Sequence, residues 1–226
     1  MARTRDPGYD DQRERILAQA AQLFAQRGYA GTSMNEVAEA CGVSKATLYH
    51  YLRDKHDLLV QIAEGHVSRL EVIAHEVEQQ YAEPKARLRE LITRFMQEYT
   101  VAQNAQRVLT EDVRFLNEQD RERILGGERR VVAAFARAIV QLRGHSAEKT
   151  GSQAPEHGKA PPQALGVPLT MLLFGMMNWM FTWLKPDGVL TYTNMAPVVS
   201  DLFFDGVLAV HYPPDTLPPQ EVLSQP

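Results

Sequence analysis

The sequence predicts an all-α fold in which a small N-terminal bundle of three helices precedes a larger helical body. Apolar residues recur at helical spacing through most of the chain, and no strand-like alternation of useful length appears. Residues 32–59 carry the signals of two short helices joined by a tight turn. With 226 residues, the chain is long enough for this bundle and for a second core of ordinary size.

The first helix is expected from about Asp10 to Arg27, because apolar residues share one face there and Gly28 follows as a stop signal. The polar residues 1–9 are expected to form a flexible arm. Residues 1–15 contain no apolar run of the kind that a secretory signal needs, which favours a cytoplasmic protein.

The next helix is expected to begin near Met34. Ser33 and Glu36 have the spacing of a capping box, in which the hydroxyl and the carboxylate satisfy free backbone amides. The helix is short because Gly42 can adopt the positive φ of a sharp reversal. A helical pair joined across such a turn is typical of a helix-turn-helix motif, but the same topology occurs in proteins that never bind DNA.

Ser44 is expected to cap the second short helix, from Lys45 to about Leu52, which is short enough to lie in a DNA major groove about 12 Å wide. Its outward side chains are hydrogen-bond donors or flat amphipathic rings, namely Lys45, Thr47, Tyr49, His50 and Tyr51. Free amides and the helix dipole favour a phosphate at helix N-termini, and the residues at such positions are Thr32, Ser33, Ser44 and Lys55.

Residues 32–59 read T-S-M-N-E-V-A-E-A-C-G-V-S-K-A-T-L-Y-H-Y-L-R-D-K-H-D-L-L. This segment resembles the DNA-binding domain of the TetR family of one-component transcriptional regulators. It departs from the family pattern at Cys41, where Ala is usual, and at Leu52, where Phe is usual. The resemblance implies base contacts by Lys45, Ala46, Tyr49 and His50. With the helix N-termini, it implies phosphate contacts by Thr32, Ser33, Ser44, Thr47, Tyr51 and Lys55.

Three regions are therefore expected: a helix-turn-helix DNA-binding domain at 1–54, a helical ligand-binding and dimerisation domain at 55–212, and a flexible tail at 213–226. The formal charge is +1 over residues 1–55 and −5 over the remainder, so an acidic body would discourage adhesion to DNA. One short helix contacts too few bases to select a site in a genome. We therefore expect a homodimer that binds a palindromic operator in double-stranded DNA.

Six further helices are predicted from the helical spacing of apolar residues, at about 54–81, 84–103, 108–116, 120–143, 164–184 and 194–211. Pro84 prevents the first of these from continuing. Residues 144–162 are rich in Gly, Pro, Ser and charge, and are predicted to form a mobile loop.

Residues 164–184 carry no charge and are long enough to cross a bilayer. Pro168, Thr170, Asn178 and Thr182 argue against a membrane span, and no second span is evident. A helix that is apolar all round also results when one side faces its own core and the other faces a partner subunit. We therefore expect no membrane association. The last two helices resemble the pair with which TetR-family proteins form a four-helix dimer interface.

The segment from Gly175 to Gly188, with Trp179 and Trp183, resembles a subgroup of TetR-family repressors of fatty-acid, steroid and aromatic-acid catabolism. Several of these repressors release DNA on binding an acyl-CoA thioester. Aromatic and methionine side chains suit an apolar acyl group, and arginines suit a CoA phosphate. The candidate ligand residues are Phe95, Tyr99, Arg107, Leu109, Val113, Arg114, Phe135, Phe174, Met177, Asn178 and Trp179.

Two alternatives stay open at this level: a repressor of a multidrug efflux gene that responds to hydrophobic drugs, and a helical ligand-binding or scaffold protein. The sequence carries none of the common catalytic motifs, so neither an enzyme nor catalytic residues are expected. No metal site is expected, since His66 and His75 lie on opposite faces of one helix and the chain has a single Cys. No cofactor is expected beyond a small-molecule effector, an acyl-CoA or aroyl-CoA thioester.

Overall fold

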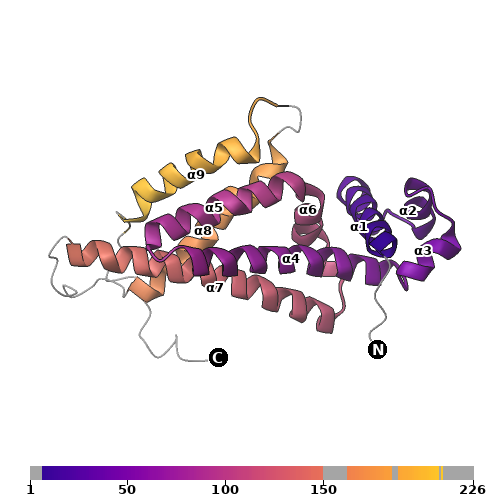
Figure 1. The fold of residues 1–226 in the computed structure, drawn as a ribbon, viewed down its shortest axis with the longest axis horizontal. Helices are drawn as coiled ribbons and strands as arrows, with labels where there is room; N and C mark the ends of the chain where they lie inside the picture. Colours follow the sequence, from indigo (N-terminus) through magenta and orange to yellow (C-terminus); the bar gives the residue numbers. More distant parts are fainter. Residues whose placement is uncertain (1–6, 150–161, 185–187, 209, 211–226) are drawn as a thin grey trace. The chain divides into compact units, whose positions relative to one another are not determined.

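The computed structural model describes residues 7–149, 162–184, 188–208 and 210. Within these residues the chain is helical and has no β-strand, which confirms the predicted all-α fold. Figure 1 shows the order of the elements along the chain. The α-helices are α1 (Pro7–Arg27), α2 (Met34–Ala40), α3 (Lys45–Tyr51), α4 (Lys55–Gln80), α5 (Pro84–Val101), α6 (Gln103–Asp112), α7 (Glu118–Lys149), α8 (Gly166–Asn178) and α9 (Tyr192–Val207). Short 3-10 helices are η1 (Val113–Phe115), η2 (Pro162–Leu165) and η3 (Trp179–Thr182).

The chain packs as two compact units. The first unit consists of Met1–Val72 and Glu98–Arg129, and the second of Ile73–Gln97 and Arg130–Pro226. Helices α4, α5 and α7 therefore contribute residues to both units. This division follows packing, so the functional boundary expected at residue 54 stays a prediction.

The core of the first unit joins the three N-terminal helices to α4, α6 and the beginning of α7. Side chains without any exposed surface come from α1, α2, α3 and α4 and hold this bundle together: Ile16, Ala20, Val37, Leu48, Leu58 and Leu59. Burying a large aliphatic side chain contributes about 1.5–3 kcal/mol, so packing of this core, rather than the helix propensity of seven-residue segments, stabilises α2 and α3.

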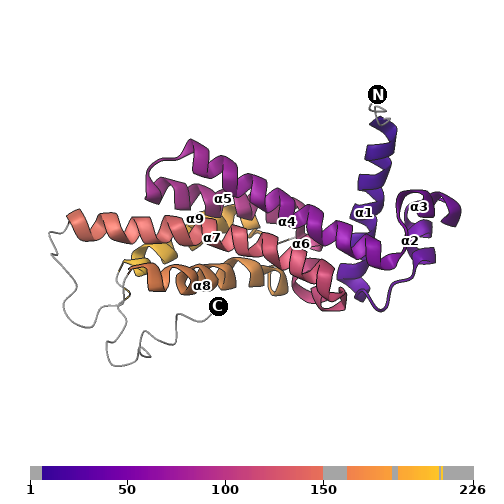
Figure 2. The ribbon, with the colours of Figure 1, turned by 90° about the horizontal axis from the view of Figure 1, so that it is seen from below.

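Helices α2 and α3 are consecutive short helices joined by a turn (Figure 2), and this turn has the geometry expected from Gly42. Gly42 has a φ of 65°. Its amide donates to the Glu39 carbonyl at 3.0 Å, and the Val43 amide donates to the Ala38 carbonyl at 3.0 Å. This pair of bonds is a Schellman motif, which satisfies the free carbonyls at the end of α2 and redirects the chain toward α3.

The second unit contains an aromatic cluster made by three helices. The ring centroids of Phe95 on α5 and Phe174 on α8 each lie 4.9 Å from that of Phe135 on α7, in edge-to-face geometry. The same unit contains aliphatic residues without exposed surface, which include Leu88, Ile92, Ile139 and Leu173. The cluster ties together helices that are far apart in the sequence.

Some predicted boundaries were wrong. Helix α1 begins at Pro7, so residues 7–9 are not part of a flexible arm; proline is well suited to the first helical position because it has no amide hydrogen to satisfy. Helix α7 continues to Lys149, so residues 144–149 do not belong to a loop, and the rest of that predicted loop up to residue 161 lies outside the described residues. Ala147, Glu148 and Lys149 are good helix formers, and this propensity explains why α7 continues past its predicted end.

The C-terminal part differs in detail as well. The apolar stretch at 164–184 is divided into α8 and its flanking 3-10 helices. Helix α9 begins earlier than expected, because Thr191 and Asn194 form a capping box in which each backbone amide donates to the other side chain, at 2.7 and 3.2 Å. The predicted tail at 213–226 lies outside the described residues.

Gly42→Ala should lower the free energy of unfolding by about 1–2 kcal/mol, because an L-residue is strained at this positive φ. No atom lies within 4 Å of the added methyl group, so the cost comes from the backbone alone. Urea unfolding at a fixed protein concentration measures the change.

The matched control is Gly144→Ala, which adds the same methyl group inside α7 with nothing within 4 Å and without a positive φ. It should raise stability by roughly 0.5–1 kcal/mol, because glycine is unfavourable inside a helix. Equal changes in the two variants would show that the turn conformation is not what requires Gly42.

Candidate nucleic-acid interface and effector site

Helix α3 is anchored by one side chain and exposes the others. Leu48 is completely buried in the core of the first unit, and Leu52, just after the helix, is almost completely buried. The four candidate base-contact residues all lie on α3 and are all exposed, namely Lys45, Ala46, Tyr49 and His50. The Lys45 ammonium lies 6.0 Å from the centroid of the Tyr49 ring, one helical turn away. The structure thus brings these residues together on one accessible side of a short helix.

The serine caps form as expected. Ser44 Oγ accepts from the Thr47 amide at 3.0 Å and shares a 2.8 Å hydrogen bond with the Thr47 hydroxyl. Both residues are exposed, so each keeps a side that a phosphate oxygen can approach. The cap orients the first turn of α3, where free amides and the helix dipole favour an anion.

The N-terminus of α2 already holds a carboxylate. The Ser33 amide donates to Glu36 Oε2 at 2.7 Å, and the Arg27 guanidinium forms an ion pair with Glu36 at 2.8 Å. Hydrogen bonds from the Ser33 hydroxyl and amide hold the pKa of the Glu36 carboxyl below its usual value. A phosphate at Ser33 must therefore approach beside an ionised side chain, the Glu36 carboxylate that the capping-box spacing predicted.

Thr32 and Lys55 form bonds within the protein. The Thr32 hydroxyl is buried and donates to the Gly28 carbonyl at 3.1 Å. The Lys55 ammonium donates to the Tyr29 and Thr32 carbonyls, both at 2.9 Å, and lies 4.4 Å from the centroid of the Tyr29 ring. These bonds hold the loop after α1 against the start of α4. The phosphate contacts predicted for Thr32 and Lys55 stay predictions.

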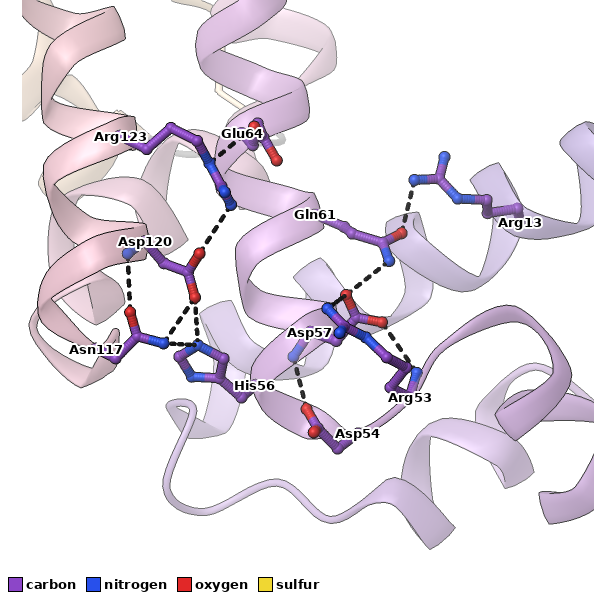
Figure 3. Close-up of polar contacts among 10 residues, drawn as sticks. All are labelled: Arg13, Arg53, Asp54, His56, Asp57, Gln61, Glu64, Asn117, Asp120 and Arg123. Carbon is purple, nitrogen blue, oxygen red and sulfur yellow. Dashed lines mark hydrogen bonds and ion pairs between the residues drawn. The ribbon is translucent and has the colours of Figure 1, made fainter.

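A polar network at the start of α4 fixes the position of the chain that leaves α3 (Figure 3). Asp57 accepts from the Arg53 amide at 2.9 Å and from Gln61 Nε2 at 3.0 Å. Gln61 in turn accepts from Arg13 on α1 at 2.6 Å. Burial would raise the pKa of the Asp57 carboxyl, but these hydrogen bonds and the Arg53 guanidinium outweigh burial and lower it. Asp57 therefore stays ionised and links the end of α3 to α1.

A second, separate polar network joins α4 to the start of α7 (Figure 3). His56 Nε2 lies 2.8 Å from Asp120 Oδ2, which also accepts from the Asn117 amide group at 2.8 Å. Arg123 bridges Asp120 at 2.9 Å and Glu64 at 3.1 Å. Neither network was predicted. The contacts that join different helices, Arg13 with Gln61 and His56 with Asp120, link residues 48 and 64 positions apart, and no spacing rule relates such residues.

The candidate ligand residues are distributed over both units. In the second unit, Phe95, Phe135 and Phe174 pack on one another and Met177 is fully buried, whereas Trp179 is 61% exposed. Asn178 is half-buried. The second unit therefore supplies apolar contact surface of the expected kind.

In the first unit, Tyr99 and Leu109 are buried and Val113 is half-buried. The two arginines proposed for a CoA phosphate are exposed but engaged: Arg107 forms an ion pair with Glu111 at 3.0 Å, and Arg114 lies 5.0 Å from the centroid of the Phe115 ring. A phosphate would have to displace these partners.

The first unit also contains a groove of about 790 Å³ between α1, α4 and the junction of α5 and α6. Its lining combines small and apolar residues such as Ala18, Ile62 and Ala102 with charged residues of both signs. None of the candidate ligand residues lines this groove. No sequence signal predicted it, because its walls come from three distant segments.

Two further questions concern metals and membranes. Among the residues that the structure describes, no three His, Cys, Asp or Glu side chains are grouped so that they could hold a metal ion. Residues Gln163–Thr182 are long and apolar enough to cross a membrane, judged by length and composition alone, and 39% of their most apolar window is buried. One such helix is weak evidence for a span, because core helices of soluble proteins share these properties.

Comparison with protein families gives two matches. Residues 16–62 match the family described as bacterial regulatory proteins, tetR family. Residues 81–207 match the family described as tetracyclin repressor-like, C-terminal domain. The second match alone covers more than half of the chain.

Individual proteins show the same relationship. The chain is 33% identical over 112 residues to the HTH-type transcriptional regulator AcrR of Shigella flexneri, a match that spans 49% of this chain and only 52% of that relative. It is 22% identical to the HTH-type transcriptional repressor KstR2 of Rhodococcus jostii over 90% of this chain and 95% of the relative.

Solved structures share the fold. A TetR-family transcriptional regulator from Bordetella parapertussis is 30% identical, with a TM-score of 0.70 over 88% of this chain and 96% of that one. AibR, in complex with isovaleryl coenzyme A and operator DNA, is 28% identical, with a TM-score of 0.67 over 84% of this chain and 97% of that one. On the two family matches and these likenesses, the chain belongs to the TetR family of bacterial regulatory proteins.

Proposed function

We propose that this protein is a homodimeric transcriptional repressor that binds a palindromic operator in double-stranded DNA and is released from it by a small molecule. The observation that carries this proposal is the exposed set of Lys45, Tyr49 and His50 on α3, held outward by the buried Leu48. Lysine and histidine can donate to base edges in the major groove, and tyrosine adds a flat ring with a hydroxyl. The site of action is the cytoplasm.

Dimerisation uses α8 and α9 in this proposal. These two helices contact each other. Each leaves large apolar side chains exposed, and the set comprises Val167, Met171, Leu172, Val198 and Leu202. Contiguous exposed apolar surface of this kind marks a protein interface. Two copies of α3 related by a two-fold axis would read the two halves of a palindrome.

The effector class is an acyl-CoA or aroyl-CoA thioester, and the regulated genes belong to fatty-acid or aromatic-acid catabolism. The likeness to AibR, whose structure holds isovaleryl coenzyme A, supports this class, as does the aromatic cluster of the second unit. The ligand favours a state in which the two DNA-binding domains stand too far apart for consecutive major grooves. Its effect is limited by the difference between its affinities for the two states.

Lys45→Ala and Tyr49→Ala should each weaken operator binding by roughly 5- to 150-fold, since each removes a contact to DNA worth about 1–3 kcal/mol. A duplex selected from a random pool by the unmodified protein serves as the operator, and fluorescence anisotropy measures the dissociation constant. Arg121→Ala is the matched control, because it removes one exposed positive charge from α7 of the same unit. Binding should also weaken steeply as salt increases, through release of counterions. If neither substitution weakened operator binding, Lys45 and Tyr49 would not be DNA contacts and this assignment would be excluded.

Leu202→Arg should shift the protein toward the monomer, because it places a charge on the exposed apolar face of α9, where Leu202 is 66% exposed. Sedimentation velocity over a range of concentrations measures the change. Val72→Arg makes the same kind of substitution at an exposed residue of α4 and should leave the dimer intact. If both variants or neither became monomeric, the interface would lie elsewhere.

Isovaleryl coenzyme A, taken as a first probe of the thioester class, should weaken operator binding at least fivefold at saturation, within the usual range of allosteric coupling. Free coenzyme A and isovalerate are the controls and should have little effect. Mass spectrometry of ligand that copurifies with the native protein extends the test to other acyl and aroyl groups. Recovery of a cationic drug-like molecule, with no response to thioesters, would favour the efflux alternative.

A further inference from the structure

Three aromatic rings meet at the end of α3: His50 and Tyr51 belong to that helix, and Tyr9 belongs to α1. The Tyr9 ring centroid lies 4.6 Å from that of Tyr51 with the planes tilted by 31°, and 5.9 Å from that of His50 with the planes at 84°. The His50 and Tyr51 centroids are 5.5 Å apart at 83°. Each pair has the separation of a favourable aromatic contact. Tyr9 precedes its two partners by more than forty residues in the chain.

We propose that Tyr9 is a positioning residue for DNA reading, which holds the His50 and Tyr51 side chains in the orientation that binds the operator. This proposal rests on the proposed function, because it assigns Tyr9 a role in the same reading surface. Tyr9 acts through its ring contacts with these two residues and not through a base contact of its own.

The end of α3 needs such support. Helix α3 has seven residues, and Leu52, which follows it, has extended backbone angles of −141° and 136°. His50 and Tyr51 therefore lie in the last turn of a very short helix, where the backbone is held least firmly. His50 is exposed, whereas Tyr51 is half-buried and packs against the core of the first unit. The core therefore does not order the His50 side chain, and Tyr9 adds a second contact to Tyr51.

The contact of Tyr9 with His50 and Tyr51 reduces the side-chain conformational entropy that is lost when the protein binds DNA. Immobilising a flexible side chain in an interface costs about 0.5–1.5 kcal/mol, and rings that are already ordered avoid much of that cost. Edge-to-face packing also restricts the plane of the His50 imidazole, which decides the direction of its hydrogen bond to a base. Tyr9 therefore contributes to affinity and to base discrimination.

The effect should be local on α3. Lys45 and Tyr49 interact with each other, whereas the rings that Tyr9 contacts are those of His50 and Tyr51 at the end of the helix. Loss of Tyr9 should accordingly relax discrimination at the base pairs that His50 reads, and leave intact the discrimination that Lys45 provides. A residue that merely stabilised the fold would affect all positions alike.

The test uses the full-length protein and the duplex that it selects from a random pool. Tyr9→Ala should weaken binding about tenfold, equivalent to about 1.4 kcal/mol, the size of an aromatic pair. Tyr9→Phe keeps the ring and should bind within about twofold of the unmodified protein. In a variant that lacks both partner rings, His50→Ala with Tyr51→Ala, adding Tyr9→Ala should have no further effect.

The readout that separates positioning from stability is a set of duplexes with single base-pair changes. Tyr9→Ala should lose discrimination between base pairs at the operator positions where His50→Ala also loses it. It should keep discrimination at the positions where Lys45→Ala loses it. The matched control is Phe115→Ala, which removes another partly exposed ring of the same unit, stacked on Tyr29 at 5.3 Å. It should leave base discrimination unchanged. If Tyr9→Ala lowers the thermal midpoint, Tyr9→Leu, which keeps apolar volume without a ring, takes its place with the same expected result.

Three outcomes would overturn the proposal. Tyr9→Ala could leave operator affinity unchanged, or it could reduce the affinity by the same factor in the variant that lacks the His50 and Tyr51 rings. Tyr9→Phe could also reduce the affinity as much as Tyr9→Ala does. The last outcome would mean that the hydroxyl contacts DNA directly. If the unmodified protein selected no duplex, the proposed function would fail first, and that result is distinct from all three.

Discussion

Complete burial of Leu48 is the constraint on which the recognition surface depends. Helix α3 is only seven residues long, so a single inward side chain determines which face is turned outward. Successive residues differ by about 100° around the helix axis, so Ala46, Tyr49 and His50 lie on other sides of the helix and are exposed when Leu48 is inside. Lys45 is exposed at the first position of the helix. Any rotation that exposed another set would place Leu48 in water, at a cost of about 1.5–3 kcal/mol. The apolar core thus orients the polar surface.

The ends of α3 are held by different means. Its beginning is determined locally, by the Schellman turn at Gly42 and the Ser44 cap. Its end is supported by partners from elsewhere in the first unit, through Asp57 and Gln61 to α1, and through the ring of Tyr9. An ionised carboxylate that is partly buried retains its hydrogen bonds because losing them would leave a charge without compensation. This requirement makes the start of α4 a rigid connection between α3 and α1.

The polar contacts that stabilise the first unit differ in strength. Exposed ion pairs such as Arg27 with Glu36 contribute little, since water and salt screen them. The Lys55 ammonium bonds to two carbonyls and lies over the Tyr29 ring, so it orders the loop after α1 more effectively. In the second unit, order comes from packed aromatic rings, while α8 and α9 leave apolar faces that are still exposed in the single chain. Such faces are what a partner subunit would cover.

Local chemistry explains what the sequence by itself determined. The capping box at Ser33 and Glu36, the turn at Gly42 and the start of α3 depend on residues three or four apart, so their spacing was sufficient to predict them. The all-α class and most helix positions followed from apolar periodicity. The start of α1 at Pro7 was missed because proline suits the first helical position although it follows a polar segment, and the extension of α7 to Lys149 was missed because helix propensity outweighed the loop-like composition there. Only the tertiary structure decided that Lys55 bonds to two carbonyls, that His56 pairs with Asp120 and that Tyr9 contacts His50 and Tyr51. These contacts join residues 23 to 64 positions apart, and which of them form depends on how the helices pack, a global property that no local pattern records.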